Sequence, residues 1–323
     1  MTDLILGIEI GGTKQQVAIG TPEGQILTLR QVRVDLASGG AGIRKWLHEQ
    51  ISELIGTAEA ENRKISAIGV GFGGPIDTAR GQVLQSIQVS GWQDFPIKSW
   101  FQEQFNLPTI VANDSNAATW GEYRCGFGRG SDHFFYTNIG SGIGGGFVFD
   151  GKLFDGQGFG AGEFGHTFVP DWANISQGMR GSQIENLCSG WAIESRLRTP
   201  GYIPGSSALY RSNPDDLVKI TTKDLGEAAR SGDPFSMAEI DRVAHSIGIG
   251  LANVLSLTGV ERIAIGGGVS NLGTLLMDPI RRYTEKYAFI SSKGRYQIER
   301  CSLGDQIVLV GALLLASECV GAP

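Results

Sequence analysis

Residues 4–14 read LILGIEIGGTK, an apolar, β-rich stretch that runs directly into two glycines, a threonine and a lysine. Residues 134–146, FFYTNIGSGIGGG, repeat this pattern, with Ile139 and Gly140 at the places that Ile10 and Gly11 hold in the first copy. Each copy continues into a second apolar stretch that ends at a turn signal. We therefore expect two β-hairpins with glycine-rich tips, in a chain that is internally duplicated.

Around these copies, strand patterns alternate with helix patterns, which is typical of an α/β sheet protein. A chain of 323 residues is long enough for two lobes, each with its own apolar core. We expect a small lobe of residues 1–118 plus a C-terminal helix at about 306–323, and a large lobe of residues 119–305. The main predicted elements are helices at 42–60, 97–105, 184–197, 222–231, 236–258 and 307–316, and strands at 65–70, 109–111 and 262–265.

The composition favours a small-molecule ligand. The net charge is −6 and the basic residues are scattered, so neither nucleic acid nor an anionic membrane surface is an expected partner. The four cysteines are far apart and form no CxxC pair, which speaks against a disulfide framework and fits a reducing compartment. Because no signal peptide or long apolar run is present, we expect a cytoplasmic protein.

The glycine-rich tips suit a polyphosphate, because glycine lets backbone N–H groups approach it while threonine and lysine add a donor and a charge. A single tip of this kind can be plain turn chemistry, but two in duplicated context favour a nucleotide triphosphate. A third cluster, after the strand at 262–265, could bring the backbone close to an adenosine, although a simple tight turn remains open. The predicted nucleotide-binding residues are Gly11, Gly12, Thr13, Lys14, Gly140, Ser141, Gly142, Gly144, Gly266, Gly267 and Gly268.

Asp114 is the candidate catalytic residue. It follows the strand at 109–111 and opens a helix of small residues, at the place where an N-cap would normally sit. A carboxylate here could instead orient an acceptor hydroxyl and take its proton as the bond to phosphorus forms. The phosphate loops elsewhere in the chain favour this second role, and Asn113 beside it offers amide donors and acceptors.

Three further polar residues follow the second hairpin. Glu163, His166 and Glu185 stand in otherwise neutral or apolar surroundings. Carboxylates accept hydrogen bonds from adjacent sugar hydroxyls and histidine can donate or accept, so such a cluster would distinguish one sugar from another. A structural role for His166 remains an alternative.

Seven ordered motifs make the sequence resemble the ROK family of sugar kinases and related repressors over essentially the whole chain. They read IGGTK, GFGGPID, VANDSNAATWGE, NIGSGIGGG, GAGEFGH, IENLCSG and IAIGGGVS. The resemblance implies a two-lobed, actin-like (ribonuclease H-like) ATPase fold, often dimeric, that phosphorylates hexoses with ATP and Mg²⁺. It implies that Asp114 is the general base, and that the sugar contacts include Gly74, Asn113, Glu163, His166 and Glu185.

The chain also departs from the family pattern. Glu9 stands where family members usually carry an aspartate associated with the metal and its water, so Glu9 is a candidate for holding Mg²⁺ through a water. The stretch 176–183, which matches the family's cysteine-rich zinc run, contains no cysteine, so we expect no structural zinc. Gln88 stands near the place where an asparagine commonly touches the sugar, so the preferred hexose can differ from glucose.

Competing hypotheses remain. Family repressors carry a helix-turn-helix domain before the kinase region, whereas this chain reaches its first glycine hairpin by Gly11, which disfavours a repressor. A non-catalytic sugar or nucleotide sensor of the same fold is the main alternative, motivated by Glu9 and by the absent zinc cysteines. An actin-like ATPase of chaperone or cytoskeletal type would need long insertions and no sugar cluster. The acceptor stays open among glucose, fructose, mannose, allose and N-acetylmannosamine.

Overall fold

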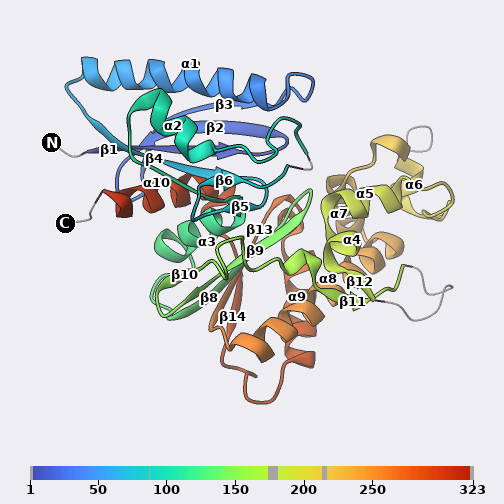
Figure 1. Ribbon diagram of the computed structural model, residues 1–323. Coiled ribbons are helices and arrows are strands. Elements are labelled where there is room, and N and C mark those ends of the chain that lie inside the picture. Colours follow the sequence, from blue (N-terminus) through green and yellow to red (C-terminus); the bar gives the residue numbers. More distant parts are fainter. Residues whose placement is uncertain (1–2, 87, 174–180, 213–216, 321–323) are drawn as a thin grey trace. The chain divides into compact units, whose positions relative to one another are not determined.

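Figure 1 shows the computed structural model of the chain, which describes residues 3–86, 88–173, 181–212 and 217–320. Contacts divide the chain into two compact α/β units. The first unit consists of Met1–Asp132, Gly146–Gly162 and Ser302–Pro323, and the second consists of His133–Gly145 and Glu163–Cys301. Each unit therefore contains one of the two glycine-rich tips.

The first unit is built on a five-stranded sheet with the order β3-β2-β1-β4-β7. Its first three strands form an antiparallel meander, and β4 and β7 add to β1 in parallel. The strands are β1 (Leu4–Ile10), β2 (Lys14–Gly20), β3 (Ile26–Arg33), β4 (Ile65–Phe72) and β7 (Thr109–Asn113). The predicted hairpin at residues 4–20 is thus confirmed.

Helices cover both faces of this sheet. Figure 1 shows α1 (Gly39–Ala60) and α2 (Ile97–Phe105) over one face and α10 (Ile307–Cys319) over the other, where α10 packs against α3 (Asp114–Cys125). Successive side chains of a strand point to opposite faces. Ile8 of β1 accordingly packs with α1 and α2, whereas Ile5 packs with α10. By the same alternation Glu9 lies on the face of α3 and α10.

The second sheet has the order β10-β9-β8-β13-β14. Strand β13 pairs in parallel with both β8 and β14, and the last residues of β9 pair with β10 in an antiparallel turn that groups with the first unit. The strands are β8 (His133–Ile139), β9 (Ile143–Phe149), β10 (Lys152–Phe154), β13 (Arg262–Gly266) and β14 (Gln297–Arg300). The consecutive strands β8 and β9 confirm the second predicted hairpin.

Most helices of the second unit follow this hairpin. They are α4 (Ile184–Cys188), α5 (Gly190–Leu197), α6 (Ala208–Ser212), α7 (Thr222–Arg230), α8 (Pro234–Thr258) and α9 (Thr274–Tyr287). The remaining elements are short: β5 (Ile76–Asp77), β6 (Gln82–Val83), β11 (Phe168–Pro170), β12 (Gly181–Gln183) and the 3₁₀ turns η1 (Phe164–His166), η3 (Leu217–Lys219), η4 (Gly268–Leu272) and η5 (Gly304–Gln306). Among the described residues, no helix is long and apolar enough to cross a membrane.

Two details differ from the sequence-based expectations. The single helix expected at 184–197 is two helices, because Ser189 leaves the helical conformation and its side chain caps α5 by accepting from the Ala192 N–H. The glycine cluster after β13 leads first into the 3₁₀ turn η4 and then into α9. Contacts keep α3 whole in the first unit, where it packs on α10.

Candidate active site

The first glycine hairpin carries its own charged side chains. Its turn from Gly11 to Lys14 closes with a 3.1 Å hydrogen bond from the Gly11 N–H to the Lys14 carbonyl oxygen. The Lys14 ammonium lies 3.6 Å from the Glu9 carboxylate, and Gln16 Nε2 donates to the same carboxylate oxygen at 2.6 Å. At the tip, the side chain of Gln88 lies so close to Gly12 that a Cβ there would overlap it. Gln88 is therefore brought to the first hairpin.

Burial raises the pKa of Glu9 above the ordinary glutamate value, and the negative charge of Asp114 raises it further. Lys14 and Gln16 oppose this shift, but burial is the largest contribution. The structure thus places two interacting carboxylates, Glu9 and Asp114, at one end of the first unit. Paired carboxylates in a buried setting are typical of sites that bind cations or move protons.

Asp114 is not the N-cap of its helix. Asn113 is the cap, since its side-chain oxygen accepts from the N–H groups of Ser115 and Asn116. Asp114 is the first residue of α3, and its Oδ1 accepts from the Ser115 N–H at 2.7 Å. The idea that Asp114 serves as the cap is therefore wrong, because the amide of Asn113 satisfies the first helical N–H groups.

The same asparagine connects Asp114 to the predicted sugar contact at Gly74. Asn113 Nδ2 donates to the Gly74 carbonyl oxygen at 3.1 Å. Asp114 Oδ2 lies next to Gly73, 3.3 Å from the point where a Cβ would stand. Gly74, Asn113 and Asp114 therefore form one local cluster at the ends of β4 and β7.

The tip of the second hairpin is held by neighbouring helices. The Gly140 N–H donates to the Gly142 carbonyl oxygen at 2.9 Å within the turn. Glu185 of α4 accepts from the Ile143 N–H at 2.7 Å, and the Gly190 N–H at the start of α5 donates to the Gly140 carbonyl oxygen at 2.7 Å. The structure thus brings Glu185 directly to the predicted phosphate loop, a contact that spacing alone could not reveal.

Glu163 and His166 lie at the two ends of η1, which packs beside the same hairpin. Gly165 lies so close to the Ile143 carbonyl oxygen that no side chain would fit, and the rings of Phe164 and Phe135 are 5.5 Å apart. The second unit therefore gathers Glu163, His166 and Glu185 around the start of β9.

The third glycine cluster also meets this hairpin. Gly267 has a φ of +82°, and a Cβ there would overlap the Ile139 backbone, whereas Gly268 has open space around it. The Gly266–Gly268 turn thus lies beside Gly140. All three predicted nucleotide-binding segments are located in this way, the first in one unit and the other two in the other.

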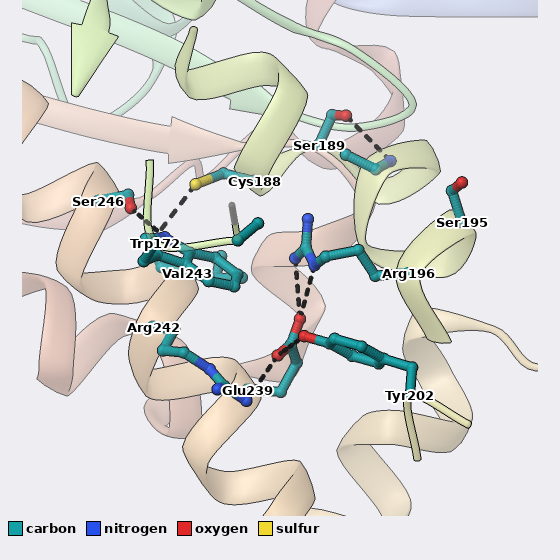
Figure 2. A network of polar contacts seen from close by, with 12 residues as sticks. Trp172, Cys188, Ser189, Ser195, Arg196, Tyr202, Glu239, Arg242, Val243 and Ser246 are labelled. Atoms are coloured by element: carbon teal, nitrogen blue, oxygen red, sulfur yellow. Dashed lines mark hydrogen bonds and ion pairs between the residues drawn. The ribbon is translucent and has the colours of Figure 1, made fainter. Parts of the chain in front are cut away.

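The helices that hold the second tip are themselves anchored on α8 by a buried carboxylate. Figure 2 shows Glu239, fully buried, accepting from Arg196 of α5 at 2.9 and 3.0 Å, from Arg242 at 3.0 Å and from Tyr202 at 2.7 Å. Both guanidinium groups also lie over the ring of Trp172, at 4.7 and 5.5 Å from its centre. This network fixes α5, and with it Gly190, to α8.

Two titratable side chains of this network are shifted far from their ordinary pKa values. Burial raises the pKa of the Cys188 thiol to about 12, and its Sγ donates to the Val243 carbonyl oxygen of α8. Burial, with the Glu239 carboxylate, raises the pKa of Tyr202 to about 12. Both groups are neutral at physiological pH and serve as structural donors.

The stretch 176–183, where we expect no zinc, lies mostly outside the described residues. In the described part of the chain, no group of three or more His, Cys, Asp or Glu residues could hold a metal ion by itself. A metal at Glu9 and Asp114 would therefore need ligands from water or from a bound phosphate.

The chain is a two-unit α/β protein of the actin-like ATPase fold. Its first sheet combines an antiparallel meander with two parallel strands, its second sheet contains the repeated hairpin, and both hairpins have glycine-rich tips. The family model described as "ROK family" matches residues 5–319, and the chain belongs to this family.

Relatives and solved structures agree with this assignment. The chain is 32% identical to a glucokinase of Streptomyces coelicolor over 98% of both sequences, and 29% identical to a glucokinase of Halalkalibacterium halodurans over 97% of this chain and 94% of the relative. A ROK family glucokinase from Streptomyces griseus, solved in complex with glucose and AMPPNP, has a TM-score of 0.78 at 32% identity and covers 98% of this chain and 99% of its own. A xylose repressor of Caldicellulosiruptor bescii is 28% identical over 99% of this chain and 79% of its own length.

Proposed function

We propose that this protein transfers the γ-phosphoryl group of ATP to a hydroxyl of a hexose, with Asp114 as the general base. The observation that carries the proposal is the placement of Asp114. It opens α3 beside Gly73 and interacts electrostatically with Glu9 of the first glycine hairpin, while Asn113 takes over the capping of the helix. A carboxylate at this place, with its Oδ2 beside Gly73, can accept the hydroxyl proton as the bond to phosphorus forms.

The other residues have complementary roles in this proposal. The turns at Gly11–Lys14 and Gly140–Gly144 present backbone N–H groups, and in the first turn a lysine, to the phosphates. Gly266–Gly268 would lie against the adenosine. In the first unit, Asn113 would bind a sugar hydroxyl beside Asp114. In the second unit, Glu163, His166 and Glu185 would bind sugar hydroxyls.

The residues at the first hairpin fit Mg²⁺. This ion is usually held by one or two carboxylates, several waters and substrate phosphates. A cation near Glu9 and Asp114 would offset the cost of burying the Glu9 charge, which is the main cause of its raised pKa, and the smaller repulsion from Asp114. When bound with ATP, Mg²⁺ would neutralise charge on the phosphate oxygens. We also propose a homodimer, as the family resemblance implies.

A sugar-responsive regulator without kinase activity is the second candidate. It is supported by the likeness to the xylose repressor and by the glutamate at position 9. The two candidates share a sugar site and differ in turnover, so an activity measurement separates them.

The test is a coupled ADP-release assay with MgATP against a panel of hexoses and N-acetylhexosamines, which includes glucose, fructose, mannose, allose and N-acetylmannosamine. Sugar-dependent release of ADP, with the phosphorylated sugar identified by mass spectrometry, is the expected result and names the acceptor. Absence of release across the panel, while calorimetry still detects sugar binding, would overturn the kinase proposal in favour of the regulator.

A further inference from the structure

Asp155, which sequence analysis did not single out, connects three segments of the first unit. It follows β10, and its Oδ2 accepts from the Thr78 hydroxyl at 2.6 Å while its Oδ1 accepts from Asn116 Nδ2 at 3.1 Å. The Gly158 carbonyl oxygen accepts from the Thr78 N–H at 2.9 Å and from its hydroxyl at 3.0 Å. The stretch 155–158 is therefore fastened both to the residue after β5 and to α3.

Each of these segments leads to a predicted sugar contact. Thr78 comes directly after β5, in the loop that begins at Gly74. Asn116 lies in the first turn of α3, two residues beyond Asp114. The stretch 155–162 continues into Glu163, the N-cap of η1. Asp155 is thus hydrogen-bonded to Thr78, which shares a loop with Gly74, and to Asn116, which shares a helical turn with Asp114. It also begins the stretch that leads to Glu163.

The hydrogen bond to Asp155 matters for the amide of Asn116. Asn116 is 2% exposed, and its side-chain oxygen is buried without a hydrogen-bond partner among the described residues. The contact from its Nδ2 to Asp155 is consequently the one that orients this amide. Loss of the carboxylate would leave both ends of a buried amide unsatisfied, which is costly, so the first turn of α3 would shift.

We propose that Asp155 is a positioning residue for the sugar, which sets sugar affinity by holding the Gly74 loop and the first turn of α3 to the stretch that precedes Glu163. The inference rests on the proposed kinase function. The glycine hairpins that would bind the nucleotide make no hydrogen bond to Asp155 in the described residues, so nucleotide binding should be independent of it.

The experiment compares Asp155→Ala, Asp155→Asn and Thr78→Val with the wild type, in steady-state kinetics with the sugar and ATP varied separately. Asp155→Ala should raise KM for the sugar about tenfold, the loss expected for about two hydrogen bonds, and leave KM for ATP within about twofold. Asp155→Asn should have a sugar KM close to that of the wild type. The side-chain oxygen of the new asparagine can accept from Asn116, and its NH₂ group can donate to the Thr78 hydroxyl, which in turn donates to the Gly158 carbonyl oxygen.

The matched control is Asp35→Ala. Asp35 also accepts from a hydroxyl, that of Ser38 at 2.5 Å, and from a backbone N–H, that of Ala37 at 3.1 Å, but in an exposed turn. Asp35→Ala should leave the KM values for the sugar and for ATP unchanged. The double variant of Asp155→Ala with Thr78→Val should lose less sugar affinity than the two single losses added together, because both substitutions remove the bond from Thr78 to Asp155. Thr78→Val additionally removes the hydroxyl contact to Gly158, where the Thr78 N–H bond remains.

An Asp155→Ala protein with unchanged sugar KM, or with equal increases in both KM values, would overturn the proposal while leaving the kinase function intact. If the wild type transfers no phosphate to any sugar, the kinase function fails and calorimetry with the same panel decides the role of Asp155. A loss of sugar affinity of tenfold or more in Asp155→Ala, relative to the wild type, would then support the proposal. Equal sugar affinity in the two proteins, or no detectable sugar binding by the wild type, would refute it.

Discussion

The two glycine hairpins have the same sequence pattern, but different parts of the molecule hold them in place. The first is surrounded by charged and polar side chains, with Glu9, Lys14 and the amide of Gln16 on its own strands and Asp114 nearby. The second tip carries no charged residue of its own. Glu185 and Gly190 hold it from outside through hydrogen bonds to its backbone.

This difference indicates a division of labour. Placing Glu9 and Asp114 close together in a buried setting costs free energy, which is typical of groups that bind cations or move protons. A backbone turn fixed by hydrogen bonds offers N–H groups in a set geometry and needs a rigid support. The first hairpin would therefore provide chemistry, and the second would provide the position of the nucleotide.

The largest effect is expected at Asp114, the carboxylate beside the first hairpin. Asp114→Asn should lower kcat about 10²-fold or more, since the amide cannot accept the hydroxyl proton. The amide keeps the shape and a hydrogen-bonding oxygen, so sugar binding measured by calorimetry should stay within about threefold of the wild type. Steady-state kinetics at saturating sugar and ATP would check the loss.

Near-normal turnover in this variant would show that the base lies elsewhere and would remove the chemical contrast between the two hairpins. A parallel loss of sugar affinity would instead assign Asp114 to binding. The two measurements together therefore distinguish the catalytic role from the binding role.

Much of the local architecture was predictable, because it depends on short-range patterns. The two hairpins, the helix at 97–105 and the strand before Asn113 follow from apolar periodicity and from glycine-rich turns. The capping of α3 could not be assigned in advance, because Asn113 and Asp114 are both good caps and nothing in the sequence says which backbone adopts the cap conformation.

Contacts between distant segments could not be predicted from one sequence. Asp155 hydrogen-bonds to side chains 77 and 39 residues away, and Glu185 accepts from a backbone N–H 42 residues away. A lone aspartate after a β-strand is ordinary, so no local pattern marks it. Glu239 shares this property, because only the fold brings Arg196 and Tyr202 to it.

The support of the second hairpin can be tested at Glu239. Glu239→Gln should lower the free energy of unfolding by about 2 kcal/mol, because Arg196 and Arg242 lose the buried negative charge that they pair with. In addition, the NH₂ group of the new glutamine would point at groups that are themselves hydrogen-bond donors, so its hydrogens would lack acceptors. Urea denaturation would measure the loss. Glu227→Gln is the matched control, because its ion pair with Lys223 is exposed and should contribute less than about 0.5 kcal/mol.

A smaller loss in Glu239→Gln than in its control would mean that the network does not stabilise the second unit. In that case the hydrogen bond from Gly190 to Gly140 would have to be supported by other contacts of α4 and α5, such as the one from Cys188 to Val243.

A third prediction concerns the second tip itself. A Cβ at Gly142 would stand 2.7 Å from Glu185 Oε2, the atom that accepts from the Ile143 N–H. Gly142→Ala should therefore push the carboxylate away and raise KM for ATP about tenfold, the equivalent of about 1.4 kcal/mol. Gly205→Ala, where nothing lies within 4 Å of the added carbon, is the control. An unchanged KM for ATP would show that the turn does not position the nucleotide.

The smallest effect is expected for a substitution of Glu9. Unlike Glu239→Gln, this substitution should raise the free energy of unfolding. Because burial raises the pKa of Glu9, the native state holds its proton more tightly than the unfolded chain does. The stability contributed by Glu9 is therefore fully present below the ordinary glutamate pKa and is lost as the pH rises through the raised value. At neutral pH the charged carboxylate destabilises the native state.

Glu9→Gln removes this charge and keeps an acceptor for Gln16, so its urea midpoint at about pH 7 should exceed that of the wild type, with the m-value unchanged. The difference should shrink as the pH is lowered from 7 toward the ordinary glutamate value of 4.5, because the wild-type carboxyl group takes up a proton on the way. Activity should fall, since the variant lacks the proposed metal-binding charge. A variant that is less stable at both pH values would mean that the contact between Glu9 and Lys14 outweighs the cost of burial, and the first hairpin would then be held by its charges in spite of the repulsion from Asp114.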